Sequence, residues 1–528
     1  LKYHDFPVAP SGPTSADPSL GPASYAMVTR VEATPAPAAA PRAAAPRSVA
    51  QLFGTATIHS GNASSALMRS GISSILILPG PAEGEAEEGP ARSILAQSVL
   101  SVSSSGLRET HVNSWPATGA LIVAEVVGTG VLALGKNFAQ LGWSVGLGVL
   151  IGGFLSNTFT SLLLAQVNLA FPNIVTLGDA ARKLLGRVGG IFGYAIVYVY
   201  IFFTMANYLI VLATAVRSAA QPVRSALHAS GPLCQPVATL IGTLVLLPGN
   251  QLRTLSGLVG LSAVSFATIC ATVVICLWTL VSGMGACDDE PSASMGFLDY
   301  NASMCGFIFA FSGQSIMLEM QAEMRQPRDF PKAVQLSFST LFTVYTLVVV
   351  LSYHTCGRGT PGELLQVVPP GGWSIAVGVL MIIHMTVTYT ILQQVLTRAC
   401  CLFLVPGALG QGPSARAKWF VVSTVLMALA YVVANSVPLF TDIVNLTGGL
   451  LSTQCAFTLP ALLYLSLRFR LPNLAGNPLG PRAQRACVAG AYVSLFLGAY
   501  FTVFGAGSSL LVLIKHAQEG LNPPFGCN

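Results

Sequence analysis

The sequence predicts an all-α polytopic membrane protein with about 11 transmembrane helices. Charged residues make up only 9% of its 528 residues, and the mean hydropathy is +0.66. Soluble domains carry roughly 25% charged residues. Long uncharged runs recur from about residue 117 to 513, and a helix that crosses a bilayer needs about 20 apolar residues. These two observations exclude an ordinary soluble domain.

The chain divides into three parts by composition. Residues 1–112 contain the Pro/Ala-rich stretch "TPAPAAAPRAAAPR" and the acidic stretch "PAEGEAEEGP". Such segments bury too little apolar surface to offset the entropy of the chain. They predict a disordered cytoplasmic N-terminal tail. A transmembrane domain at 113–515 and a short C-terminal tail at 516–528 are expected to follow.

The apolar runs define the expected helices in chain order. The predicted spans are 117–135, 143–166, 189–214, 233–249, 257–281, 303–323, 334–354, 373–397, 417–437, 443–467 and 487–513. With a cytoplasmic N-terminus, Lys and Arg concentrate in the inner loops, as the positive-inside rule requires. Fourteen of these residues then lie inside, namely Arg182, Lys183, Arg187, Arg253, Arg325, Arg328, Lys332, Arg398, Arg416, Lys418, Arg468, Arg470, Arg482 and Arg485, against five outside, namely Lys136, Arg217, Arg224, Arg358 and Lys515.

Two of the predicted spans contain residues that interrupt a helix. These are Gly128-Thr129-Gly130 in the first span and Ser312-Gly313-Gln314 in the sixth. Non-helical backbone at membrane depth is tolerated only around a cavity or inside protein. Small residues also allow close helix packing, which is the simpler interpretation of either interruption alone. Their positions, five spans apart, instead favour an inverted repeat with a binding site between two broken helices.

Polar side chains near these interruptions are candidate ion-coupling groups. Glu125 lies one turn before the first interruption, and a carboxylate inside a membrane is functional by default, with a proton as its expected partner. A neutral structural Glu is the alternative. His384 and Thr388 share a face of the eighth span, where Thr388 could hold Na⁺ or relay a proton. The alternatives are that His384 only packs against other helices and that Thr388 bonds to the backbone of its own helix. Tyr208 either lines a cavity or anchors at the membrane interface.

The eleven cysteines do not show the paired spacing of a metal site. No metal or other cofactor is expected, apart from a transported H⁺ or Na⁺. Cys234, Cys287 and Cys356 fall in predicted outer loops, so one disulfide can form among them.

Four stretches make the chain resemble the amino acid/auxin permease family, a transmembrane amino acid transporter family of the amino acid–polyamine–organocation superfamily. They are "VVGTGVLALGKNFAQLGW" (126–143), "FAFSGQSIMLEMQAEMRQPRDFPKA" (309–333), "IIHMTVTY" (382–389) and "VPLFTDIVNLTGGLLS" (437–452). The resemblance covers about 113–513. It implies a leucine-transporter-like fold, in which five-plus-five helices form an inverted repeat and helices 1 and 6 are broken.

The resemblance also implies a function and a site. The function is secondary transport of amino acids, H⁺-driven or Na⁺-driven. The implied substrate-binding residues are Gly128, Thr129, Gly130, Tyr208, Phe309, Phe311, Ser312, Gly313 and Gln314, and the ion-coupling candidates are Glu125, Thr388 and His384. Glu125 departs from the family, which usually has a small or amide residue there, so the coupling ion stays open.

The sequence-based hypothesis is therefore an H⁺-coupled amino acid symporter that works by alternating access. The alternatives are a Na⁺-coupled transporter and a receptor-like amino acid sensor that signals through its tail. An enzyme is not expected, because the sequence has no nucleophile–base pair at useful spacing. The expected partners are the amino acid and the lipid bilayer, with no nucleic acid and a monomeric state. Plasma membrane and a vacuolar or lysosome-like membrane both remain open.

Overall fold

The computed structural model describes residues 113–519 and 525–527, except for gaps at 229–230, 232, 254–257, 290–294, 411, 438 and 472–479. The tail predicted at 1–112 lies outside the described residues. The fourteen α-helices of the described part are α2 (Trp115–Val126), α3 (Gly130–Ala170), α4 (Leu177–Ala226), α5 (Gln235–Leu246), α6 (Leu258–Val281), α7 (Phe297–Phe311), α8 (Gln314–Ala322), α9 (Phe330–Cys356), α10 (Gly372–Leu404), α11 (Pro413–Ser436), α12 (Phe440–Thr447), α13 (Leu459–Arg470), α14 (Pro481–Tyr500) and α15 (Ala506–Gln518).

Eight helices in this part of the chain are long and apolar enough to cross a membrane. Two of these eight consist of two labelled helices each: α12 and α13 are joined by π-helical turns, and so are α14 and α15. Large apolar side chains such as Val188, Trp278 and Phe496 are exposed on the helix surfaces, as lipid contact requires. The chain is therefore an all-α, multi-pass membrane protein, as predicted. The number of eleven crossings stays a prediction.

The helix boundaries follow local sequence signals. The first two predicted spans share α3, which turns sharply at Gly142, where φ is 71°. Glycine adopts this conformation without the steric penalty that other residues have. Helix α4 begins at a capping box, in which the Thr176 hydroxyl accepts from the Asp179 amide. Most of the spans predicted from hydropathy thus correspond to helices with recognisable ends.

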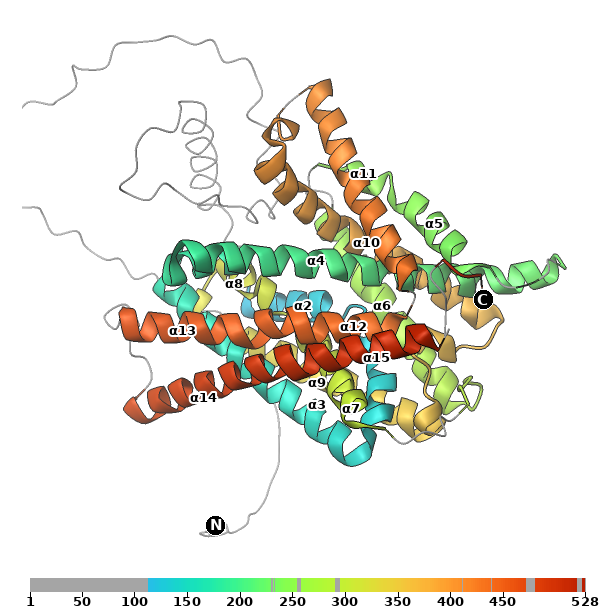
Figure 1. The fold of residues 1–528 in the computed structure, drawn as a ribbon, viewed down its shortest axis with the longest axis horizontal. Coiled ribbons are helices and arrows are strands. Elements are labelled where there is room, and N and C mark those ends of the chain that lie inside the picture. Colours follow the sequence, from blue (N-terminus) through green and yellow to red (C-terminus); the bar gives the residue numbers. More distant parts are fainter. Residues whose placement is uncertain are drawn as a thin grey trace, which may run out of the picture. The chain divides into compact units, whose positions relative to one another are not determined.

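Helices from the two halves of the predicted repeat pack against one another. Helix α3 contacts α7 and α9, α4 contacts α10, and α5 contacts α11. Figure 1 shows α13 between α4 and α14, and α13 contacts both. Helices of the first half of the chain therefore pack against helices of the second half.

Two disulfides join segments near the predicted outer ends of the helices. Cys287 pairs with Cys356, which confirms the expectation of one disulfide among the three outer-loop cysteines. Cys234 pairs instead with Cys527, a partner that the sequence did not indicate. This second disulfide fastens the C-terminal segment, whose Phe525 amide also donates to the Asn435 carbonyl at 2.9 Å.

Candidate functional site

The first interruption separates α2 from α3 at residues 127–129, where it was predicted. The Gly128 amide donates to the Val126 carbonyl at 2.8 Å, which closes a turn instead of continuing the helix. Thr129 then caps α3; its hydroxyl is buried and has no hydrogen-bond partner among the described residues. A Cβ on Gly130 would lie 2.7 Å from Ala310 Cα, so the backbone of α3 touches that of α7 at this point.

The second interruption lies at Ser312 and Gly313, between α7 and α8. The Ser312 hydroxyl is also buried, and it interacts with the side chain of Tyr200 on α4. Gln314 is fully buried, and its side-chain oxygen accepts from the Gly313 amide at 3.1 Å. Its amide nitrogen lies 3.1 Å from Asn157 Oδ1 and 3.2 Å from Thr160 Oγ1, both on α3. Gln314 therefore anchors the start of α8 to α3.

The two candidate phenylalanines point to different helices. The Phe309 ring lies 6.2 Å from that of Tyr200 on α4, measured between centroids. The Phe311 ring lies 4.9 Å from that of Tyr345 on α9 and is completely buried. Tyr208 approaches from α4, with its hydroxyl 3.2 Å from where a Cβ on Gly128 would be. Tyr208 and Phe309 thus share the α4 side of the interruptions, and Phe311 lies on the α9 side.

The three candidate ion-coupling residues have different neighbours. Glu125 is exposed and lies within electrostatic range of Tyr208 on α4 and Glu319 on α8. His384 is buried, with Nδ1 at 2.8 Å from the Ser265 hydroxyl of α6. The Thr388 hydroxyl donates to the His384 carbonyl at 3.0 Å, within its own helix. His384 and Thr388 therefore make the contacts that their structural alternatives predict.

Two residues at the interruptions were not singled out from the sequence. Tyr345 donates to the Ala310 carbonyl at 2.8 Å, and Asn157 belongs to the group that binds Gln314. A tyrosine or asparagine inside an apolar span needs a hydrogen-bond partner when it is buried. That requirement marks both as candidates, although it does not identify the partner.

A cavity of about 360 Å³ lies elsewhere, between α4, α5 and α10. Its lining is mostly apolar and includes Leu212, Val216, Ile241 and Ile382. None of the sequence-predicted site residues lines it. The polar groups suited to a small charged solute are instead those of the two interruptions.

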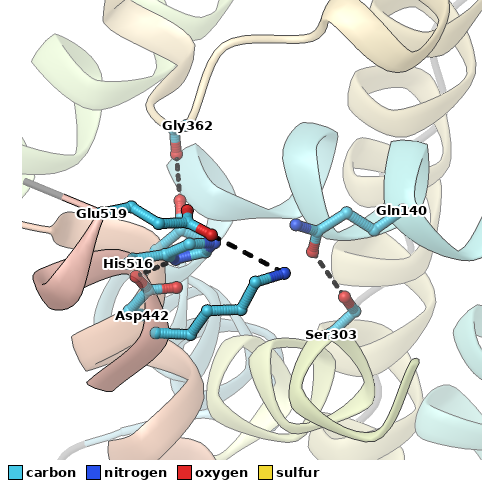
Figure 2. Close-up of polar contacts among 8 residues, drawn as sticks. Gln140, Ser303, Gly362, Asp442, His516 and Glu519 are labelled. Carbon is cyan, nitrogen blue, oxygen red and sulfur yellow. Dashed lines mark hydrogen bonds and ion pairs between the residues drawn. The ribbon is translucent and has the colours of Figure 1, made fainter. Parts of the chain in front are cut away.

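The loop at 357–371, between α9 and α10, is attached to helices at the predicted outer side. Thr441 at the start of α12 donates to the Gly362 carbonyl at 2.7 Å (Figure 2). Next to it, His516 Nδ1 of α15 lies 2.7 Å from Asp442 Oδ2 (Figure 2). The first contact holds the loop against the start of α12, and the second joins α12 to α15.

The arrangement at the interruptions can bind a dipolar solute. Helices α3 and α8 begin there, and a helix N-terminus carries about +0.5 elementary charge and free amide hydrogens. Helices α2 and α7 end there, and their terminal carbonyls attract cations. The buried hydroxyls of Thr129 and Ser312 belong to these two interruptions.

Comparison with known proteins identifies the family of the chain. A family model described as "Transmembrane amino acid transporter protein" matches residues 111–504. The chain is similar to "Amino acid transporter AVT1D" of Arabidopsis thaliana, with 25% identity over 389 residues that cover 72% of this chain and 68% of that protein. It is also similar to the "N amino acid transport system protein" of Neurospora crassa, with 21% identity over 377 residues, or 69% of this chain and 78% of that one. Among solved structures, that of MhsT in complex with L-phenylalanine aligns with 74% of this chain and 100% of its own, at a TM-score of 0.45 and 12% identity.

Proposed function

Because the chain belongs to the transmembrane amino acid transporter family, we propose that it carries amino acids across a membrane by H⁺-coupled symport with alternating access. The observation that carries the proposal is the close approach of α3 and α7 at Gly130 and Ala310, next to the buried hydroxyls of Thr129 and Ser312. The α-carboxylate of the substrate would bind the N-termini of α3 and α8. Its ammonium group would face the carbonyls that end α2 and α7.

Glu125 is the residue that we propose to carry the coupled proton. It is close to the first interruption and to Tyr208, so its charge acts on the site where the substrate would bind. Protonation would remove a negative charge from the end of α2, whose carbonyls are already electronegative. Substrate binding and proton binding would then favour the same conformation, which is the requirement for coupled transport.

Uptake into proteoliposomes tests this function. The purified full-length protein is assayed with a panel of labelled amino acids, with and without an imposed pH gradient. We expect uptake of at least one amino acid, accelerated when the outside is acidic. Acceleration by Na⁺ alone would reassign the coupling ion, and the absence of uptake for every amino acid would refute transport. Saturable binding without uptake would indicate the receptor-like alternative.

A substitution tests the role of Glu125. Glu125→Gln is expected to retain exchange of labelled for unlabelled substrate but to lose accumulation driven by the pH gradient. Glu323→Gln, which changes another acidic residue near α8, is the matched control and should retain accumulation. An unchanged pH profile in Glu125→Gln would show that this side chain is structural.

A further inference from the structure

Tyr345 contacts both interrupted helices at once. It belongs to α9 and is completely buried. Its hydroxyl lies 2.8 Å from the Ala310 carbonyl of α7 and 3.4 Å from the Val126 carbonyl of α2. Val126 is the last residue of α2, and Ala310 is the last but one of α7. The terminal carbonyls of a helix have no amide of a following turn to bind. The Val126 carbonyl already accepts from the Gly128 amide, so the Tyr345 hydroxyl is a second, longer contact for Val126 and the main donor for Ala310.

The charges at the C-terminal ends of α2 and α7 explain why a hydroxyl is suited to the position between them. Each helix C-terminus carries about −0.5 elementary charge, so two C-termini that face the same point repel one another. A shared O–H dipole between them reduces that repulsion without the cost of burying a full positive charge. The single hydroxyl hydrogen can donate to one carbonyl at a time, and the shorter distance assigns it to Ala310.

The packing of the Tyr345 ring, and not only its hydrogen bond, positions the Tyr345 hydroxyl. The Tyr345 ring packs edge-on against Phe311, with 4.9 Å between centroids. Phenylalanine at position 345 would retain this packing and lose only the donor. The effect of the hydrogen bond can therefore be separated from the effect of the ring.

We propose that Tyr345 is a positioning residue that couples the two interruptions through the terminal carbonyls of α2 and α7. The proposal rests on the proposed function, because the coupled carbonyls are those that would face the ammonium group of the substrate. Without the hydroxyl, the ends of α2 and α7 separate more easily, and both interruptions become less ordered together. Substrate affinity then falls, while the rate of the transport cycle at saturation is retained.

Hydrogen exchange measured on the purified full-length protein tests the coupling without any transport assay. In Tyr345→Phe, amides of both 127–132 and 312–316 are expected to exchange about 2- to 10-fold faster, the range that one net hydrogen bond contributes. Tyr389→Phe is the matched control, because Tyr389 is also fully buried and its hydroxyl has no partner in the described chain. Faster exchange in only one segment, in neither, or equally in the control would overturn the proposal.

Uptake kinetics provide the second readout. Tyr345→Phe should raise KM about 2- to 10-fold with a nearly unchanged Vmax per folded molecule. A lower Vmax at constant KM would indicate a structural role and overturn the proposal. If the wild type transports no amino acid, the proposed function fails, while the exchange measurement still decides the coupling. Should Tyr345→Phe not fold, 3-fluorotyrosine incorporated at position 345, a stronger donor, must slow exchange in both segments.

Discussion

Glu363 makes the stability of the outer loop depend on pH. It lies in the loop between α9 and α10 and is only 1% exposed. Burial raises the pKa of Glu363 to about 8, and a hydrogen bond with Thr214 and the charge of Arg217 act in the opposite direction. Both of these residues belong to α4, so the carboxyl group joins the loop to that helix. The pKa therefore reports whether the loop is packed against α4.

The sign of the effect follows from linkage. The folded protein holds the Glu363 proton more tightly than the unfolded chain, whose glutamate pKa is 4.5. The stabilisation is complete below pH 4.5 and is lost as the pH rises through about 8. Within that interval each pH unit removes about 1.4 kcal/mol of unfolding free energy, or on the order of 5 kcal/mol in all. If the loop opens locally and exposes Glu363 to water, the unfolding free energy falls by less than this amount.

Thermal unfolding of the purified protein between pH 5 and 9 measures the effect. Glu363→Gln resembles the protonated side chain, so the Tm of this variant should exceed that of the wild type at pH 9 and approach it at pH 5. The matched control is Glu519→Gln, which changes an exposed glutamate at the end of α15. Parallel curves for the wild type and Glu363→Gln, or a lower Tm for the variant at pH 9, would refute the reasoning.

Two further substitutions test contacts that hold the fold around the site. Gln314→Ala removes the donor to Asn157 and leaves buried polar atoms unsatisfied, so it is expected to lower the unfolding free energy by about 1–3 kcal/mol. Denaturant unfolding measures this change, and an unchanged unfolding midpoint would contradict it. Cys287→Ser removes the disulfide to Cys356 and should cost about 2–4 kcal/mol. Its Tm should lie between those of oxidised wild type and of reduced wild type, because reduction also breaks the bond from Cys234 to Cys527. A Tm equal to that of oxidised wild type would show that the bond from Cys287 to Cys356 does not form.

The positions of both interruptions could be predicted because they depend on local chemistry. Gly128 and Gly130 flank Thr129, and Gly313 follows Ser312, so each site lacks the side chains that favour a continuous helix. The two interruptions lie five predicted spans apart, and this spacing indicated that they are equivalent positions of an inverted repeat. This reasoning required no knowledge of which helices touch, and the helix ends at Val126 and Phe311 agree with it.

The partners of the polar residues could not be predicted in the same way. Hydropathy shows that Gln314 and His384 lie within spans, but it does not show which neighbouring helix each faces. The structure places Gln314 against α3 and His384 against Ser265 of α6. The same limit concealed the bond from Cys234 to Cys527, since 293 residues separate them in the sequence. Such contacts are decided by the packing of distant helices, which a single sequence does not specify.

The two interruptions are fastened to the rest of the bundle by contacts of unequal strength. The start of α8 is held to α3 by the Gln314 amide, which has both Asn157 and Thr160 within 3.2 Å. Among the hydrogen bonds of the described residues, one hydroxyl hydrogen of Tyr345 links the ends of α2 and α7 to α9, beside the packing of α2 against α9. Because a single shared hydrogen costs less to break than a buried amide network, loss of the Tyr345 hydroxyl should destabilise the fold less than loss of the Gln314 amide. Glu125 lies on the last turn of α2, one residue before the carbonyl that the Tyr345 hydroxyl approaches. If Glu125 carries the proton as proposed, a change in its charge would act directly on this contact.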